Sequence, residues 1–331
     1  MSDRPGPSFG ALDLGTNNCR LLVARPKGDG FRVVDAFSRI VRLGEGVARS
    51  GQLSEEAMER TIGALRVCAG KLRRGGVRRY RAVATEACRR AENRQAFIDR
   101  ACDDTGLSIE IISPAEEVQL ALDGCTPLFD RGMRHVLVLD IGGGSTELIW
   151  VRLDNGGPPE LAAWTSIGHG VVSLAERYGG DRVGRPVYDE MVAEIEAEIG
   201  PFAETHSITA GAGDDTVQLL GTSGTVTTIA GIHLALPRYD RQQVDGLRLQ
   251  FDDVRAVIDE VIDQDYAARA AQPCIGPGRG DVMVAGCAIL DAVMAICPAG
   301  QLDVADRGLR EGMLLRMMRA ARARRRQNAS P

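Results

Sequence analysis

Short apolar stretches alternate with longer amphipathic stretches along most of the chain. Near the N-terminus, residues 9–13 and 19–25 have the composition of two strands, and a Gly-Thr-Asn-Asn loop joins them. The same order of strand, glycine-bearing turn and strand recurs at 136–140 and 147–152, beginning 127 residues after the first. Because internal self-similarity is typical of repeated units, this pattern predicts a duplicated structural unit.

Helical periodicity follows both hairpins. Ser54 precedes two glutamates, which is the pattern of a capped helix start, and we expect that helix to reach about Leu72. Asp281 is expected to cap another helix that ends near Ile296. Further helices are expected over 93–105, 115–124, 188–199, 226–235 and 308–319, and strands over 77–84, 108–112 and 217–220. One helix is expected to turn an acidic face to solvent, formed by Glu190, Glu194 and Glu198. This alternation predicts an α/β fold whose mixed sheets are flanked by helices.

Length and composition narrow the class of protein. The 331 residues suit two domains better than one. The mixture of 44% hydrophobic and 26% charged residues is typical of folded globular proteins. No apolar run approaches the roughly 20 residues that span a bilayer, and Met1–Pro7 lacks the apolar core of a secretory signal. We therefore expect a cytoplasmic protein with no membrane partner.

The eight cysteines and four histidines show no metal-binding spacing. No two cysteines form a C-x-x-C pair, most of them lie in apolar segments, and the histidines are scattered. We expect reduced, buried thiols rather than disulfides or zinc, and no histidine metal site.

Charge is divided unevenly along the chain, although the net formal charge is only −5. Residues 1–128 and 306–331 together hold 28 Lys and Arg against 19 Asp and Glu, whereas residues 129–305 hold 12 against 26. If the C-terminal segment folds back onto the first lobe, one lobe is basic and the other acidic, which suits an enzyme that docks a polyanion. Ordinary solvated surface explains the same counts, so both interpretations stay open at this point.

Two Asp-x-Gly turns carry the candidate chemistry. Each places a carboxylate at a strand end, Asp13 or Asp140, and continues with small residues whose N–H groups can approach an anion closely. A third loop, 221–225, lies between an expected strand and an expected helix, where it is either another phosphate site or an ordinary capped connection. The expected phosphate-binding residues are Gly15, Thr16, Asn17, Gly142, Gly143, Gly144, Ser145, Ser223, Gly224 and Thr225.

These motifs resemble those of the exopolyphosphatase and guanosine pentaphosphate phosphohydrolase family. The resemblance rests on the three turns and on the segments Thr85–Asn93 and Ile112–Glu117, and it extends over nearly the whole chain. It implies two actin-like, ribonuclease H-like lobes, 1–128 with 306–331 and 129–305, and an active site in the cleft between the lobes. Because the sequence ends after a basic tail, the chain resembles the short, two-domain branch of the family.

The resemblance also implies a role for each site residue. Glu117, rather than the adjacent Glu116, would be the general base that activates water. Arg89, rather than Arg90, would neutralise phosphate charge. The implied ligands of Mg²⁺ or Mn²⁺ are Asp140, Glu147 and, through water, Asp13. A base, a guanidinium, a metal ion and backbone amides are sufficient for phosphoryl transfer.

The implied activity is release of terminal orthophosphate from inorganic polyphosphate by in-line attack of water. Hydrolysis of guanosine pentaphosphate is the alternative, and the sequence does not separate the two. A kinase or a non-enzymatic nucleotide-binding protein of the same fold is a rival from another class, and the context of Glu117 argues against the kinase. We expect no nucleic-acid partner, and a homodimer stays open. Since glycines replace larger residues of the family pattern at 278–281, we expect a looser loop there.

Overall fold

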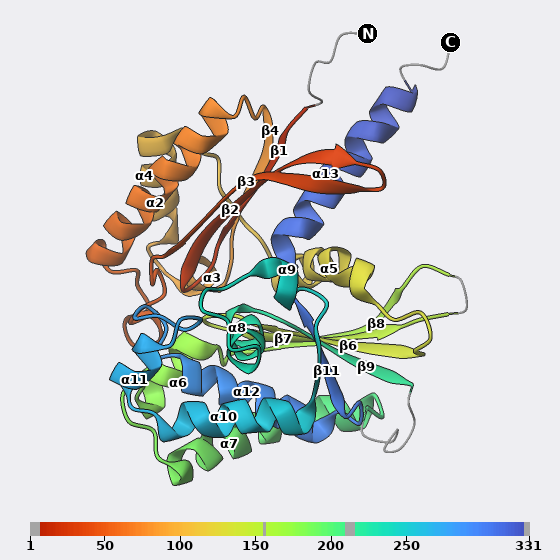
Figure 1. Ribbon diagram of the computed structural model, residues 1–331. Coiled ribbons are helices and arrows are strands. Elements are labelled where there is room, and N and C mark those ends of the chain that lie inside the picture. Colours follow the sequence, from red (N-terminus) through yellow and green to blue (C-terminus); the bar gives the residue numbers. More distant parts are fainter. Residues whose placement is uncertain (1–6, 155–156, 209–215, 328–331) are drawn as a thin grey trace. The chain divides into compact units, whose positions relative to one another are not determined.

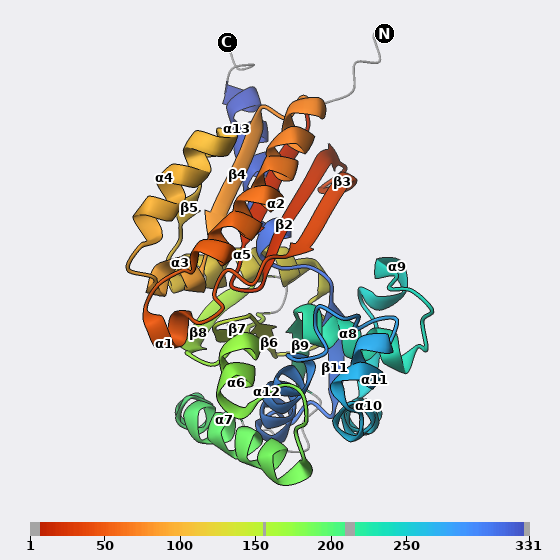
Figure 2. The same ribbon diagram turned by 90° about the vertical axis from the view of Figure 1, so that its left-hand side faces the viewer.

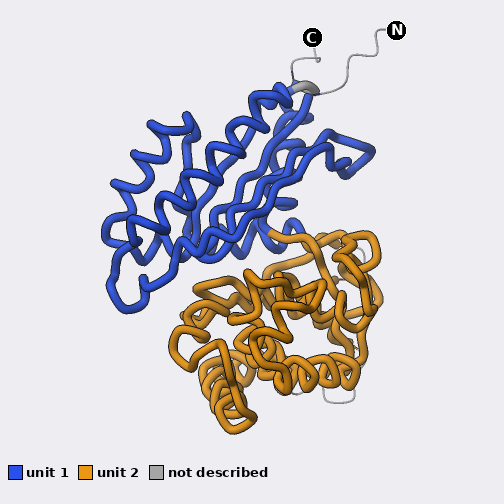
Figure 3. Tube along the Cα trace, turned by 60° about the vertical axis from the view of Figure 1, so that its left-hand side comes forward, with its two compact units in different colours: residues 1–124, 309–331 blue, residues 125–308 orange. Residues whose placement is uncertain are grey.

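The chain folds into two compact units. The structure is a computed structural model, and it describes residues 7–154, 157–208 and 216–327. Unit 1 comprises residues 1–124 and 309–331, and unit 2 comprises residues 125–308 (Figure 3). The sequence placed these boundaries after residue 128 and before residue 306. The segment 1–6, most of the N-terminal stretch considered above, lies outside the described residues.

Unit 1 is built on a five-stranded mixed sheet. Its strands are β1 (Phe9–Leu14), β2 (Asn18–Lys27), β3 (Gly30–Ile40), β4 (Arg79–Ala84) and β5 (Glu110–Ile111). They lie in the order β3-β2-β1-β4-β5, in which β1, β4 and β5 are parallel and β2 and β3 are antiparallel to their neighbours. The helices are α1 (Val47–Ser50), α2 (Glu55–Arg74), α3 (Glu86–Arg90), α4 (Arg94–Thr105), α5 (Pro114–Cys125) and α13 (Leu309–Gln327).

Each face of this sheet has its own hydrophobic core. Helices α2 and α4 cover one face (Figure 2), where Ile62, Leu65 and Phe97 are buried. Helices α5 and α13 cover the other face (Figure 1), with Leu120 and Met313 in a second apolar cluster. Because both faces of the central strand β1 are covered, its sequence is an almost continuous apolar run, as is usual for a strand buried on both sides.

Unit 2 contains a six-stranded mixed sheet. Its strands are β6 (His135–Ile141), β7 (Thr146–Arg152), β8 (Glu160–Ile167), β9 (Val217–Thr222), β10 (Arg248–Gln250) and β11 (Gln301–Ala305), in the order β10-β11-β9-β6-β7-β8. A short 3₁₀ turn, η1 (Thr126–Leu128), precedes them. The helices are α6 (Val171–Tyr178), α7 (Arg185–Thr205), α8 (Gly224–His233), α9 (Arg241–Val244), α10 (Phe251–Asp263), α11 (Tyr266–Ala271) and α12 (Met283–Ile296).

The two sheets share their central topology. In unit 1, β1 pairs antiparallel with β2 and parallel with β4. In unit 2, β6 pairs antiparallel with β7 and parallel with β9. The duplicated hairpin seen in the sequence therefore sits at the same place in both sheets, and the expected α/β fold class with mixed sheets flanked by helices is confirmed.

Several local expectations need correction. Asp281 does not cap α12, because that helix begins at Met283 after Val282 and has no side-chain cap. The strand expected over 108–112 shortens to the two residues of β5. Glu194 is not simply solvated, since it accepts a hydrogen bond from Tyr178 Oη at 2.5 Å. Ser54 does cap α2, accepting a hydrogen bond from Ala57 N at 3.2 Å.

Seven of the eight cysteines are buried free thiols, and Cys102 is exposed.

None of the helices within the described ranges is long and apolar enough to cross a bilayer.

Candidate active site

In unit 1, three loops meet at the carboxyl ends of the parallel strands. The register pairs Leu14 of β1 with Ala84 of β4, and Ala84 with Ile111 of β5. Thr85 N donates to Leu14 O at 3.2 Å, and Ile112 N donates to Ala84 O at 3.1 Å. Since loops after parallel strands emerge at the same sheet edge, the residues that follow these strands are brought together.

The first of these loops is the turn between β1 and β2. Gly15 N donates to Asn18 O at 2.9 Å and closes the turn. Within the described residues, no hydrogen bond uses the N–H groups of Thr16 and Asn17, and the buried Asn17 Oδ1 has no partner. The turn therefore presents unused polar groups, as a phosphate cradle requires.

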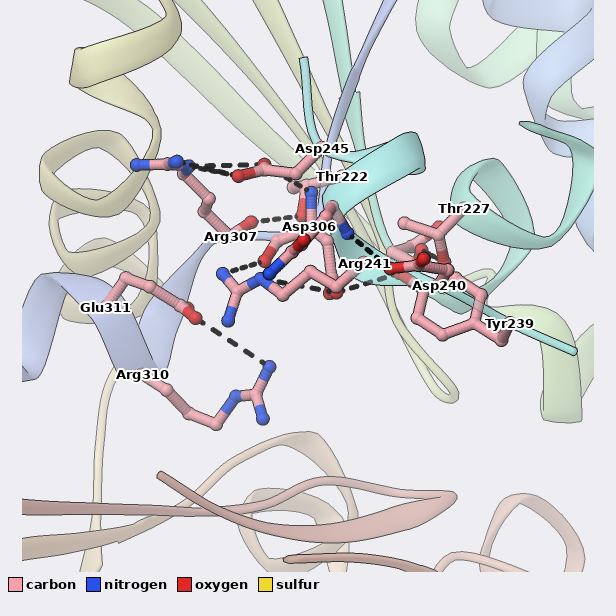
Figure 4. Close-up of polar contacts among 12 residues, drawn as sticks. Thr222, Thr227, Tyr239, Asp240, Arg241, Asp245, Asp306, Arg307, Arg310 and Glu311 are labelled. Carbon is pink, nitrogen blue, oxygen red and sulfur yellow. Dashed lines mark hydrogen bonds and ion pairs between the residues drawn. The ribbon is translucent and has the colours of Figure 1, made fainter. Parts of the chain in front are cut away.

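Asp13 precedes this turn at the end of β1. Burial raises the pKa of its carboxyl, and the charges of Arg20 and Arg310 oppose that rise. The buried Glu311 of α13 raises the pKa of Asp13 further. Asp13 thus lies in a small cluster of charges inside unit 1. The sequence did not single out Arg310 or Glu311, which form an ion pair at 4.0 Å (Figure 4).

The segments after β4 and β5 lead into α3 and α5, which place Arg89 against Glu117. Arg89 Nη1 donates to Glu117 Oε2 at 2.7 Å and to Ile112 O at 3.0 Å, and its Nε donates to Glu86 Oε2 at 3.0 Å. The side chains of Arg89 and Glu117 are each 14% exposed. Although burial alone would lower the pKa of Arg89, the ion pairs with Glu117 and Glu86 raise it above its ordinary value.

One end of the Arg89 guanidinium makes an ion pair but no hydrogen bond with the described residues. Glu86 Oε2 lies 2.9 Å from Nη2, but its hydrogen bond is with Nε, so the buried Nη2 has no hydrogen-bond acceptor among the described residues. A buried N–H group without an acceptor is costly and is typically satisfied by a ligand or water.

Glu116 and Arg90, which the sequence alone does not distinguish from Glu117 and Arg89, do not take part in this ion pair. Glu116 accepts a hydrogen bond from Arg81 Nη2 at 2.6 Å rather than from Arg89. Arg90 is exposed. Glu117 and Arg89, chosen on the family resemblance, are therefore paired with each other, and their catalytic roles stay a prediction.

In unit 2, a second sheet edge gathers the remaining candidate residues. The register pairs Asp140 of β6 with Thr222 of β9, and Ala305 of β11 with Thr222. It also pairs Asp140 with Glu147 across the β6–β7 hairpin, so their side chains lie on the same face of the sheet. Two carboxylates and two glycine-bearing turns therefore lie at this edge.

Glu147 is held rigidly in this arrangement. Its Oε1 accepts hydrogen bonds from Ser145 Oγ and from Ser166 Oγ, both at 2.8 Å, and the residue is 3% exposed. A buried carboxylate that accepts two hydroxyl hydrogen bonds has its orientation fixed before any ligand binds.

The turn between β6 and β7 is hydrogen-bonded to the first residues of α6. Val171 N donates to Gly142 O at 3.0 Å, and Val172 N donates to Gly143 O at 2.8 Å. These bonds use the carbonyl groups of the turn. No hydrogen bond within the described residues uses the N–H groups of Gly143 or Gly144. The turn can therefore offer backbone donors to an anion.

The third turn leads into α8. Ser223 has φ 146° and ψ 176°, and its Oγ accepts a hydrogen bond from Val226 N at 3.3 Å as the helix cap. Arg279 Nη1 donates to Gly224 O at 3.3 Å and to Thr228 Oγ1 at 2.9 Å. Arg279 thus ties the segment 278–281 to the start of α8, and the looser loop expected there relative to the family stays a prediction.

Three glycines that lie against these turns were not among the residues expected from the sequence. A Cβ at Gly44 would lie 2.2 Å from Thr16 Cγ2, and one at Gly286 would lie 2.2 Å from Thr225 Oγ1. A Cβ at Gly170 would lie 2.4 Å from the carbonyl carbon of Gly143. At Gly170 the obstacle is backbone, so only glycine fits there, whereas at Gly44 and Gly286 a threonine side chain would have to move. A glycine inside the apolar run of α12 is a signal that could have identified Gly286.

A polar network fixes the segment that leaves β11 in unit 2 (Figure 4). Arg307 donates to Asp245 through Nε and Nη2, at 2.9 and 2.6 Å, and Thr222 Oγ1 donates to Arg307 O at 2.5 Å. Tyr239 Oη donates to Asp306 Oδ2 at 2.7 Å. Because Thr222 directly precedes Ser223, this network also fixes the approach to the third turn.

Comparison with known proteins agrees with these motifs. The profile of the Ppx/GppA phosphatase family matches residues 22–321. Guanosine-5'-triphosphate,3'-diphosphate pyrophosphatase of Photobacterium profundum is 30% identical over 324 residues, which cover 94% of this chain and 59% of that protein. Exopolyphosphatase 2 of Mycobacterium tuberculosis is 30% identical over 322 residues, covering 92% of this chain and 97% of that protein.

Among solved structures, the crystal structure of an exopolyphosphatase-like protein is similar with a TM-score of 0.84 and 32% identity, covering 95% of this chain and 98% of that one. The family match spans most of the chain and includes Arg89, Glu117 and the Asp-x-Gly hairpin of unit 2, and it begins at residue 22, after the first Asp-x-Gly turn. On sequence and fold together, this chain belongs to the Ppx/GppA phosphatase family.

Proposed function

We propose that this chain is a phosphoric anhydride hydrolase that releases terminal orthophosphate from inorganic polyphosphate. The pair of Arg89 and Glu117 carries the proposal, because it joins a candidate base to a guanidinium whose Nη2 has no hydrogen-bond acceptor in the described structure. The name of the Mycobacterium tuberculosis relative supports this activity. Its length is matched almost completely, whereas this chain spans 59% of the Photobacterium relative.

The roles proposed for unit 1 follow from the contacts of Arg89. A phosphate oxygen would accept from Nη2 and compete with Glu117 for the guanidinium, because charge-assisted bonds to phosphate are strong. Glu117, with less of its charge neutralised, would then accept the proton of the attacking water. The free N–H groups of Thr16 and Asn17 would bind further phosphate oxygens.

Unit 2 would supply the metal site. Within the described residues, no three acidic, histidine or cysteine side chains form a metal-binding group. Mg²⁺ is commonly held by one or two carboxylates together with water and substrate phosphates, and Asp140 and Glu147 fit that requirement as a pair on one sheet face. When bound, the ion would neutralise charge on the phosphates. Mn²⁺ has similar ligand preferences, and a water-mediated contact from Asp13 stays a prediction.

Inorganic polyphosphate is proposed as the main substrate because of the charge of unit 1. Residues 1–124 and 309–331 hold 27 Lys and Arg against 18 Asp and Glu. A long polyanion gains more from such a surface than a single nucleotide does. Guanosine pentaphosphate is the second candidate, favoured by the name of the Photobacterium relative.

We place the protein in the cytoplasm as part of the same proposal.

The test measures phosphate release from long-chain polyphosphate, guanosine pentaphosphate and ATP with and without Mg²⁺. We expect the wild-type protein to act on polyphosphate and Glu117→Gln to lose at least about 100-fold in kcat. Glu116→Gln is the matched control, because Glu116 contacts Arg81 and should leave kcat nearly unchanged. A wild-type protein inert on all three substrates would contradict the hydrolase proposal. Equal activity of Glu117→Gln and Glu116→Gln would contradict the role of Glu117.

A further inference from the structure

Helix α13 touches α5 backbone to backbone within unit 1. A Cβ placed on Gly312 would lie 1.9 Å from Leu120 O and 2.8 Å from the Leu120 carbonyl carbon. No other glycine in the described residues meets a backbone atom at so short a distance. Because the obstacle is backbone rather than a flexible side chain, only glycine fits at this position without moving one of the helices.

A second contact lies one turn further along α13. Arg316 Nη2 donates to Gln119 O at 3.2 Å, and its Nε donates to the carboxylate of Asp123. The side chain of Leu120 is fully buried in the same apolar cluster as Met313 and Leu314. Backbone contact, side-chain packing and a guanidinium therefore all hold α5 at a defined position against α13.

Helix α5 carries Glu117 in its first turn. Leu120 follows Glu117 by three residues, so the contact with Gly312 lies less than one helical turn from the candidate base. Arg89 is anchored separately, through Ile112 O and Glu86. A shift of α5 would therefore move Glu117 relative to Arg89 rather than move the two together.

We propose that Gly312 is a positioning residue for the hydrolytic reaction, setting the place of Glu117 through the contact of α13 with α5. The inference rests on the proposed function of Glu117. A Cβ atom essentially never comes within 3.0 Å of a neighbouring heavy atom, so alanine at this position would push the helices apart by about 1 Å. A misplacement of about 1 Å in a catalytic group can cost about 100-fold in rate.

The test compares three glycine-to-alanine variants of unit 1 in the full-length protein. Gly312→Ala is expected to lower kcat by about 10- to 100-fold, with KM changed by less than about threefold, because the base is displaced while phosphate binding is kept. Gly63→Ala, on α2 with nothing within 4 Å of its Cβ, is expected to change neither. Gly10→Ala, which crowds Leu72 Cδ2 at 2.6 Å, is expected to lower stability but not kcat.

The Gly10 variant separates positioning from general loss of stability. If Gly312→Ala lowers kcat no more than Gly10→Ala does at a comparable fall in Tm, the positioning role is wrong. If Gly312→Ala does not fold, Arg316→Gln is compared with Gly10→Ala in its place. That variant keeps Gly312 and removes the bond to Gln119 O, so we expect a smaller loss of kcat, about three- to tenfold. A kcat equal to that of Gly10→Ala would overturn the proposal.

A measurement without substrate keeps this inference distinct from the proposed function. Amide hydrogen exchange over 115–124 should be faster in Gly312→Ala than in Gly10→Ala, because α5 no longer packs closely against α13. If the wild-type protein hydrolyses none of the substrates, the proposed function fails, and exchange alone then decides whether Gly312 positions α5. Equal exchange in the two variants would overturn that placement even in an active enzyme.

Discussion

At the scale of single residues, Arg89 has more contacts than a lysine could reproduce. Its guanidinium reaches Glu86, Ile112 O and Glu117 from one side chain and still presents Nη2. A lysine ammonium is a point charge that cannot span three acceptors in different directions. In the proposed function, the arginine would therefore both orient the candidate base and keep a donor for phosphate.

Arg89→Lys should accordingly lower kcat/KM for polyphosphate hydrolysis by about 100-fold, comparable to losing one anion-stabilising donor. Arg90→Lys is the matched control, because Arg90 is exposed and carries the same charge. Steady-state phosphate release compares the two variants. Similar kcat/KM for both would remove Arg89 from the site.

His135 gives a pH-dependent prediction away from the candidate site. Burial and the charges of Arg152 and Arg134 lower its pKa below the ordinary value of 6.5, and its ring stacks on Trp150 with centroids 4.7 Å apart. Below pH 6.5 the unfolded chain gains a proton at this position more readily than the folded protein. Stability is therefore lost as the pH falls from above 6.5 toward the lowered pKa.

His135→Phe keeps an aromatic ring against Trp150 and removes the titration. As the pH falls from 8 to 5.5, we expect the Tm of the variant to rise relative to the Tm of the wild-type protein. Thermal unfolding at both pH values measures this. A difference that is the same at both would show that His135 does not titrate abnormally.

Residue identities were only partly predictable from the sequence. Asp13, Asp140 and both glycine turns follow from a carboxylate placed at a strand end. The choice between Glu116 and Glu117 depends on which residue reaches Arg89, and that is set by where α5 begins. Gly312 carries no sequence signal of its role, because Leu120 approaches it only after α5 and α13 have packed.

At the scale of secondary-structure elements, the start of α8 combines a cap with an unusual backbone. Ser223 caps the helix through Oγ, yet its φ of 146° lies where glycine is favoured. The helix cap therefore favours serine at this position, whereas the backbone conformation favours glycine.

Two variants separate these preferences. Ser223→Ala removes the cap and keeps the strained backbone, so it should lower the free energy of unfolding by about 1 kcal/mol. Ser223→Gly also removes the cap but relaxes the backbone, and it should cost only about a few tenths of a kcal/mol. Urea unfolding of both variants measures the contrast. A glycine variant less stable than the alanine variant would contradict the assigned conformation.

Two of the strands missed in the sequence, β3 and β8, share a physical cause. Strand β3 is an edge strand with exposed residues on both faces. Strand β8 is one of the two edge strands of the other sheet, and exposed positions alternate along most of it. Neither shows the apolar run that identified β1 and β6. Hydrophobic patterns reveal strands that are buried, and edge strands need not be.

At the scale of the whole molecule, basic residues are in excess in unit 1 and acidic residues in unit 2. Unit 1 has an excess of nine basic residues, from 27 Lys and Arg against 18 Asp and Glu, although the chain as a whole is acidic. If polyphosphate docks on unit 1, its attraction should be screened by salt, since the Debye length falls to about 8 Å at physiological ionic strength.

The KM for long-chain polyphosphate should therefore rise several-fold between about 50 and 300 mM KCl, with a smaller change in kcat. Tripolyphosphate, which covers less of the surface, serves as the comparison and should respond less. Initial rates at several salt concentrations provide the data. A salt response of the same size for both substrates would argue against docking on the basic surface.

The course of the chain has a consequence for synthesis on the ribosome. Unit 1 takes its first part from residues 1–124 and its last helix, α13, from residues after 308, so unit 2 is made in between. Until α13 emerges, the apolar residues Phe9, Leu22 and Leu120 lack the helix that covers them. The apolar cluster on this face of the sheet therefore stays open until unit 2, nearly two hundred residues, has been translated.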